Sequence, residues 1–148
     1  MSQFHIDTGP RVNPGRLWAG GAATACVAVL VAFVGILTAR GLVHVAVLAP
    51  GRAGTWDGAS TLTYALSSAA ITLGATGLLH LLLVTTPRAR SFFGWIMVLL
   101  TAIAVVIPLG LSAGLDARLA TAVINLAIGL AITITLSGVA SAARRTEL

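Results

Sequence analysis

The stretch that decides the fold is ATGLLHLLLVTTPRAR, at residues 75–90. An apolar run that contains His80 stops at Pro87, and Arg88 and Arg90 follow at once. Proline disrupts the interior of a helix, and arginines collect where membrane helices reach cytoplasmic water. The stretch therefore predicts the end of one membrane span, a tight link and the beginning of the next span.

The distribution of charge extends this pattern to the whole chain. Only 9% of the 148 residues are charged, against about 25% in soluble domains, and the mean hydropathy is +1.00. Four stretches carry no charged residue, at residues 17–39, 58–87, 91–115 and 119–143. A helix needs about 20 predominantly apolar residues to cross a bilayer, so each stretch can hold one span.

We therefore expect an all-α integral membrane protein, an antiparallel up-down-up-down four-helix bundle. A single membrane domain is predicted over residues 17–142, with spans at 17–38, 60–84, 92–111 and 119–142 and short links between the last three. Residues 1–16 and 143–148 are predicted tails. Residues 39–59 form an outer loop, whose weak alternation around Val45 and Val47 fits a short strand or a segment that dips into the bundle.

The arginines predict the orientation of the bundle. With four spans, both tails and the link between spans two and three share one side, which holds Arg11, Arg16, Arg88, Arg90, Arg144 and Arg145. The other side holds Arg40, Arg52 and Arg118. Because positive residues in short flanks stay in the cytoplasm, we predict the cytoplasmic (inner) membrane with both termini inside. Arg16, Arg88, Arg90, Arg144 and Arg145 are candidates to bind anionic lipid headgroups.

Several functional classes are disfavoured by composition. The net charge of +5 does not indicate nucleic acid, because the arginines flank the spans and form no basic stripe. The single cysteine, Cys26, excludes an intramolecular disulfide and a paired-cysteine redox site. The carboxylates lie outside the spans, and no serine has both a base and an orienting acid nearby. We therefore expect no enzyme, no metal and no cofactor.

Small and polar residues recur along the spans at the spacing of one helix face. Helices in a membrane associate through close packing at such residues. The repeats are Thr121, Asn125, Gly129, Thr133 and Ser137 in span four, Gly20, Thr24, Ala28 and Ala32 in span one, and Ala70, Gly74 and Gly77 in span two. We expect these ridges to face other helices, with the Ile and Leu residues of span four facing lipid.

Two buried polar side chains stand out, although Thr24, Thr121, Thr133 and Ser137 are further polar candidates within the spans. A buried amide needs partners, so Asn125 is expected to face Ser67, Ser68 or a nearby backbone carbonyl. His80 lies too deep for free contact with water, and we expect a neutral ring bonded to a hydroxyl. Packing and ligand binding both remain open for His80.

Five segments occur together and in order: GRLWAGGAATA, VLAPG, LLHLLLVTTPR, FFGWI and ATAVINLAIGLAI. As a set they resemble a family of small four-span membrane proteins of high-GC bacteria that is catalogued as a domain of unknown function. The likeness covers roughly residues 15–140 and implies the same architecture without an activity. It draws attention to His80, Pro87, Arg88 and Asn125.

The leading functional hypothesis is a structural or accessory subunit that packs through its small-residue ridges against copies of itself or a larger membrane complex. The alternative is a carrier or binder of a small neutral or lipidic molecule, using His80 and Asn125, which requires a cavity between spans two and four. A third hypothesis is a redox protein that binds a cofactor.

Overall fold

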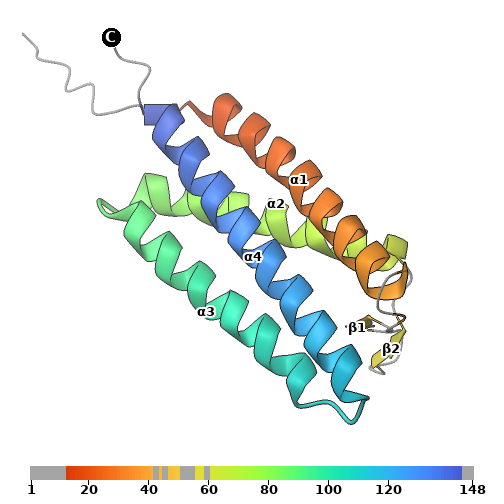
Figure 1. Cartoon of the computed structure of the whole chain (residues 1–148). Helices are drawn as coiled ribbons and strands as arrows, with labels where there is room; N and C mark the ends of the chain where they lie inside the picture. The colour runs from red at the N-terminus through yellow and green to blue at the C-terminus, as the bar shows by residue number, and fades with distance from the viewer. Residues whose placement is uncertain (1–12, 42–43, 45–46, 51–55, 59–60, 145–148) are drawn as a thin grey trace, which may run out of the picture.

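The computed structural model describes residues 13–41, 44, 47–50, 56–58 and 61–144. Its helices are α1 (Pro14–Gly41), α2 (Thr61–Thr85), α3 (Ala89–Leu109) and α4 (Leu115–Arg144), and two short strands, β1 (Leu48–Pro50) and β2 (Trp56–Gly58), lie between α1 and α2 (Figure 1). All four helices are long and apolar enough to cross a membrane. The predicted all-α four-helix bundle is confirmed, and its helices indicate a multi-pass membrane protein.

Helices α1 and α4 begin at local start signals in the sequence, and these lie before the beginnings of the apolar runs. The Asn13 side-chain oxygen accepts a hydrogen bond from the Arg16 amide at 3.3 Å, and Pro14 is the first helical residue. Asparagine before a helix and proline at its first position are favoured start signals. At the far end of the chain α4 begins at Leu115 and carries Asp116 in its first turn. Both helices therefore begin before the predicted residues 17 and 119.

The helices are not equally close to one another. α1 packs along α2 and α4, and α3 packs along α4, whereas α2 meets α3 over a shorter stretch. Figure 1 shows the reason, since α2 is inclined to the other three helices. We call the end where α1 begins and α4 ends the tail end, and the end with β1 and β2 the loop end. The link between α2 and α3 lies at the tail end.

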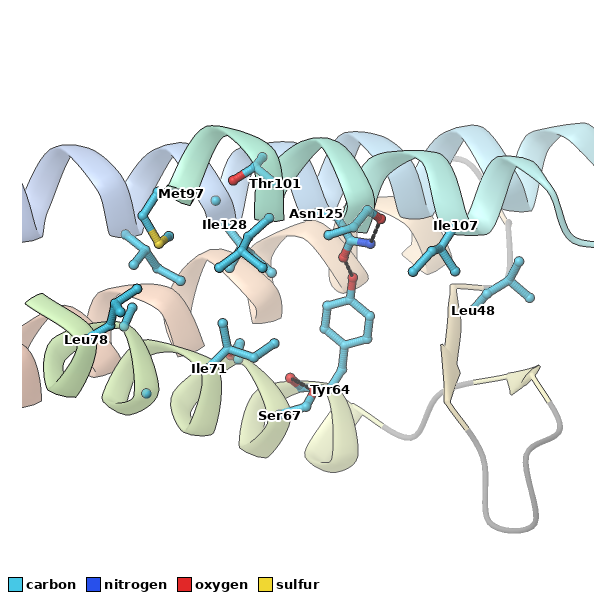
Figure 2. Close-up of a pocket in the computed structure, with 17 residues that line it drawn as sticks. Leu48, Tyr64, Ser67, Ile71, Leu78, Met97, Thr101, Ile107, Asn125 and Ile128 are labelled. Atoms are coloured by element: carbon cyan, nitrogen blue, oxygen red, sulfur yellow. Dashed lines mark hydrogen bonds between the residues drawn. The ribbon is translucent and has the colours of Figure 1, made fainter. Parts of the chain in front are cut away.

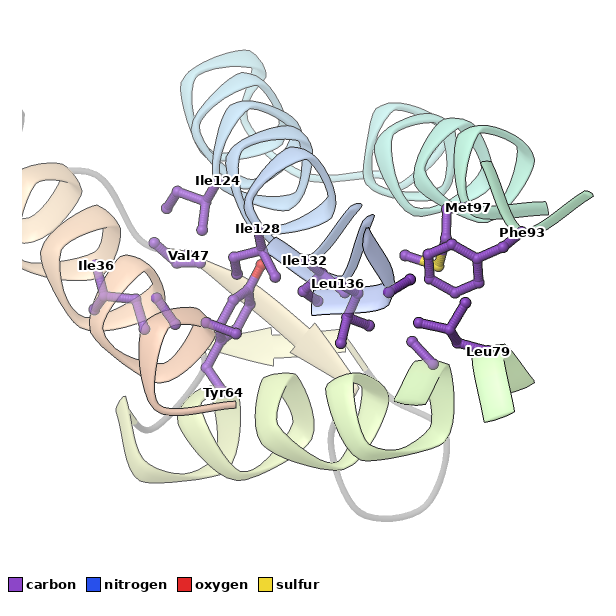
Figure 3. Packing of buried hydrophobic residues seen from close by; sticks show 14 of the residues in the cluster. Ile36, Val47, Tyr64, Leu79, Phe93, Met97, Ile124, Ile128, Ile132 and Leu136 are labelled. Atoms are coloured by element: carbon purple, nitrogen blue, oxygen red, sulfur yellow. The ribbon is translucent and has the colours of Figure 1, made fainter. Parts of the chain in front are cut away.

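Large aliphatic residues of α4 fill the centre of the bundle. Ile124, Ile128, Ile132 and Leu136 are all buried and belong to one apolar cluster (Figure 3). The expectation that these residues face lipid was wrong. α4 contacts both α1 and α3 along its length, so two adjacent ridges of this helix are covered, the aliphatic one as well as the small one. The exposed large apolar residues of α4 are Leu115, Leu119, Val123, Leu126, Leu130 and Ile134.

The segment after α1 returns to the bundle. Val47 is fully buried in the apolar cluster and Leu48 is 7% exposed. The Leu48 amide donates a hydrogen bond to the Thr121 hydroxyl of α4 at 2.9 Å, and β1 pairs antiparallel with β2. Of the two alternatives expected for this loop, the buried Val47 and Leu48 agree with a segment that dips into the bundle. The strand β1 begins after the alternating residues, at Leu48, and Val45 lies outside the described residues. The buried segment and the strands together cover part of the loop end of the bundle.

Most hydroxyl groups of the helices bond to their own backbone. The Thr24, Thr72, Thr76 and Thr133 hydroxyls each donate to the carbonyl four residues earlier, at 2.7–2.9 Å. This bond satisfies a hydroxyl without any second helix. A threonine in these spans therefore behaves as a small residue for packing, and its polarity does not require a partner.

Candidate functional site

The small-residue ridge of α4 faces α3. Gly129 is buried, and a Cβ at this position would collide with the side chain of Thr101 on α3. At one end of the ridge, the Arg90 guanidinium of α3 donates to the Ser137 carbonyl at 3.5 Å. Thr121 at the other end holds the Leu48 amide. The ridge therefore fixes both α3 and the loop to α4.

The ridge of α1 is also covered. Thr24, Ala28 and Ala32 are fully buried, and a Cβ on Gly20 would collide with Val139 of α4. For α1 and α4, the sequence pattern identified the faces at which helices approach most closely.

The ridge of α2 was assigned to the wrong face. Ala70 and Gly74 are exposed, and no heavy atom lies within 4 Å of a Cβ built on Gly74 or Gly77. The side chains that α2 buries are Tyr64, Ala65, Ser68, Thr72, Ala75, Thr76 and Leu79. Since the hydroxyls of Ser68, Thr72 and Thr76 bond within α2, these residues pack like small apolar ones. The glycines are left on the outside of the described bundle.

Asn125 joins three helices. Its oxygen accepts a hydrogen bond from the Tyr64 hydroxyl of α2, and its amide nitrogen donates to the Ala104 carbonyl of α3 at 2.6 Å (Figure 2). The bond to a backbone carbonyl agrees with the prediction, but the predicted serines are not partners. Ser67 and Ser68 bond instead to carbonyls of α2. Asn125 therefore bridges α2 and α3 near the loop end, where these helices lie apart.

A cavity of about 510 Å³ occupies the space between α2 and α3, with α4 as its floor. Its outer rim is formed by exposed residues of both helices, among them Ile71 and Gly74 of α2 and Leu100 of α3. Figure 2 shows Tyr64 and Asn125 within it, Leu48 and Ile107 toward the loop end, and Leu78 and Met97 toward the tail end. Because the rim lies on the side of the bundle, the cavity opens toward the lipid. We call it the α2–α3 cavity.

His80 lies outside this cavity and pairs with an aromatic side chain. The Trp18 indole N–H of α1 donates to the His80 Nδ1 at 3.2 Å. The expected hydroxyl partner was wrong, and the Thr24 hydroxyl, one of the groups expected at this depth, bonds to its own helix. Trp18 is 45% exposed at the tail end, where an indole fits the membrane interface. The pair ties α1 to α2.

The remaining candidates are spread over the bundle. Thr133 is half-buried and its hydroxyl bonds within α4. Arg16, Arg88 and Arg90 are exposed at the tail end, so they can reach lipid headgroups there. The side chains of Arg144 and Arg145 lie outside the described part of the structure. Within the described residues, no group of three or more His, Cys, Asp or Glu side chains could hold a metal ion.

Sequence reasoning missed Tyr64 and the gap between α2 and α3. Tyr64 is the single tyrosine of the chain, and a buried tyrosine hydroxyl usually has a hydrogen-bond partner. Tyr64 is close in sequence to Ser67, which was expected at the same membrane depth as Asn125. This shared depth could have predicted the contact between Tyr64 and Asn125. No comparable signal in the sequence predicts the inclination of α2.

Fold and cavity together define a small multi-pass membrane protein with a lipid-facing pocket lined mainly by apolar side chains. The chain belongs to a family of unknown function, DUF6069, which matches residues 12–142. No curated protein and no solved structure matches the chain.

Proposed function

We propose that this protein binds a membrane-soluble molecule in the α2–α3 cavity. The observation that carries the proposal is a cavity of about 510 Å³ that opens sideways between two lipid-exposed helices. Ligand pockets commonly have volumes of about 300–1,000 Å³ and a mainly apolar lining with few polar groups. The cavity has this character, since its polar groups are few and Tyr64 and Asn125 are the most prominent.

The route of entry is through the bilayer. The buried Val47 and Leu48 cover the loop end of the bundle, and Leu48 itself lines the α2–α3 cavity. The rim residues Ile71 and Leu100 are exposed on the side of the bundle. A lipophilic molecule can therefore reach the pocket without leaving the membrane. Binding or carrying such a molecule involves no chemical reaction, so we do not propose that the chain is an enzyme.

The experiment is photo-crosslinking in liposomes with a hexadecanol that carries a diazirine in its chain. Labelled peptides are then identified by mass spectrometry. We expect label to concentrate on cavity residues of α2 and α3. Uniform labelling of all lipid-facing helix surfaces would contradict the proposal.

A matched pair of glycine variants controls the experiment. Gly74 lines the cavity and no atom of the described residues lies within 4 Å of its Cβ position, so we expect Gly74→Leu to reduce the volume of the pocket without a clash at the Cβ. Gly138 is equally open but does not line the cavity. We expect Gly74→Leu to reduce cavity labelling at least severalfold and Gly138→Leu to leave it unchanged. Equal labelling of the two variants would count against the cavity as the site.

A second candidate function is the accessory subunit that packs against a partner helix. The supporting observation is a row of small residues on α2, in which Ala70 and Gly74 are exposed, Gly77 is half-buried, and a Cβ on either glycine would meet no atom of the described bundle within 4 Å. Small residues of this kind allow two membrane helices to approach closely. The two candidates share Gly74, which lines the cavity, but Gly77 belongs to the row alone, because it does not line the cavity.

A further inference from the structure

We infer that the ligand of the α2–α3 cavity is a neutral amphiphile, a long apolar chain that ends in one uncharged hydroxyl or carbonyl group. Its head binds at the Tyr64–Asn125 pair and its chain runs toward the tail end. The inference rests on the proposed function and names the ligand class of the same cavity.

The first support is the hydrogen-bonding capacity of the pair. The Asn125 amide has two N–H groups, and among the described residues one of them has a protein partner, the Ala104 carbonyl at 2.6 Å. The Tyr64 hydroxyl donates its hydrogen to Asn125, which leaves its oxygen lone pairs as acceptors. The pair thus offers one donor and one acceptor. A hydroxyl group can use both, and a carbonyl can use the donor.

The second support is the absence of charge from the lining. None of the described residues around the cavity is Arg, Lys, Asp, Glu or His. An ionised head buried here would lose its hydration without gaining a counter-ion, which is strongly unfavourable. A carboxylate, phosphate or ammonium head is therefore disfavoured, and an uncharged polar head fits.

The third support is the shape of the cavity. Its α2 lining extends from Tyr64 to Leu78, a rise of about 21 Å along a helix. Figure 2 shows that Tyr64 and Asn125 lie toward the loop end, and that Ile71, Leu78 and Met97 follow toward the tail end. Ser67 and Ser68 also line the cavity, but both hydroxyls donate within α2 at 2.8–2.9 Å. A polar head beside a long apolar slot is the complement of a single-chain amphiphile.

The test is competition against the diazirine-bearing hexadecanol in liposomes that contain the full-length protein. The competitors are 1-hexadecanol, hexadecane and hexadecyl sulfate, which share one chain and differ in the head. We expect 1-hexadecanol to compete best, because it alone supplies a neutral head. If the cavity is labelled and hexadecane or hexadecyl sulfate competes equally well, the inference is overturned while the proposed function stands. If no probe labels the cavity, the proposed function fails.

A pair of variants locates the head. Tyr64→Phe removes one hydroxyl, and we expect it to reduce the preference for 1-hexadecanol over hexadecane by about threefold, the effect of one average hydrogen bond in a membrane. Ser67→Ala removes another hydroxyl of the same cavity that bonds only within α2, so the preference should persist. An unchanged preference in Tyr64→Phe would overturn this position for the head. The wild-type competition needs no variant and decides the ligand class by itself.

Discussion

At the scale of single residues, two glycines of α4 have opposite surroundings. Gly129 is buried where α4 approaches α3, and a Cβ there would collide with Thr101. Gly138, nine residues further along α4, is exposed, and no atom of the described residues lies within 4 Å of its Cβ position. The first glycine permits a close helix contact, and the second does not.

Alanine at these two positions should therefore change stability in opposite directions. We expect Gly129→Ala to lower the free energy of unfolding by about 1–3 kcal/mol, the usual effect of overpacking. Gly138→Ala should be neutral or slightly stabilising, because alanine is the better helix former. Unfolding in a denaturing detergent, followed by tryptophan fluorescence, measures both.

A double variant separates collision from any other effect at Gly129. In Gly129→Ala with Thr101→Ala, the threonine atoms nearest the new methyl group are removed, so part of the lost stability should return. Strictly additive effects of the two substitutions would show that the two sites do not interact, and the close-contact interpretation would then be abandoned.

At the scale of elements, α2 carries two glycines, Gly74 and Gly77, whose Cβ positions meet no atom of the described residues within 4 Å. Gly77 is half-buried and does not line the α2–α3 cavity. If the chain assembles through α2, Gly77→Leu should break the assembly in mild detergent and leave probe labelling of the cavity intact. Native mass spectrometry measures the mass of the assembly. An unchanged mass for Gly77→Leu would exclude this face of α2 as the contact.

The sequence predicted the four helices well and the angles between them poorly. Charge-free stretches predicted all four helices, because crossing a bilayer demands a long apolar run. Spacing by four identified the ridges of α1 and α4, where glycine, alanine and threonine coincide. The same rule failed for α2, since Thr72 and Thr76 bond within their own helix and pack as well as glycine. The α2–α3 cavity could not be predicted, because the inclination of a helix depends on side-chain packing along several neighbours at once.

At the scale of the whole molecule, orientation in the membrane is a prediction that labelling can check. We expect the tail end in the cytoplasm, because most arginines flank it. In a Cys26→Ala background, Ser112→Cys in the link between α3 and α4 should react with a membrane-impermeant maleimide in intact cells. Ser91→Cys, in the first turn of α3, should react only after permeabilisation. The reverse labelling pattern would show that the bundle has the opposite orientation, with the Tyr64–Asn125 pair near the cytoplasmic leaflet.

The hydroxyl bonds within the helices have a consequence for biosynthesis. Because Thr24, Thr72 and Thr76 satisfy their hydroxyls within one helix, these hydroxyls need no neighbouring helix when α1 and α2 leave the translocon. Asn125 bonds instead to Tyr64 and Ala104, which belong to α2 and α3. Both of these helices are synthesised before α4, so the partners of Asn125 exist before Asn125 itself. α4, the helix whose Asn125 depends on two other helices, is thus the last to be synthesised.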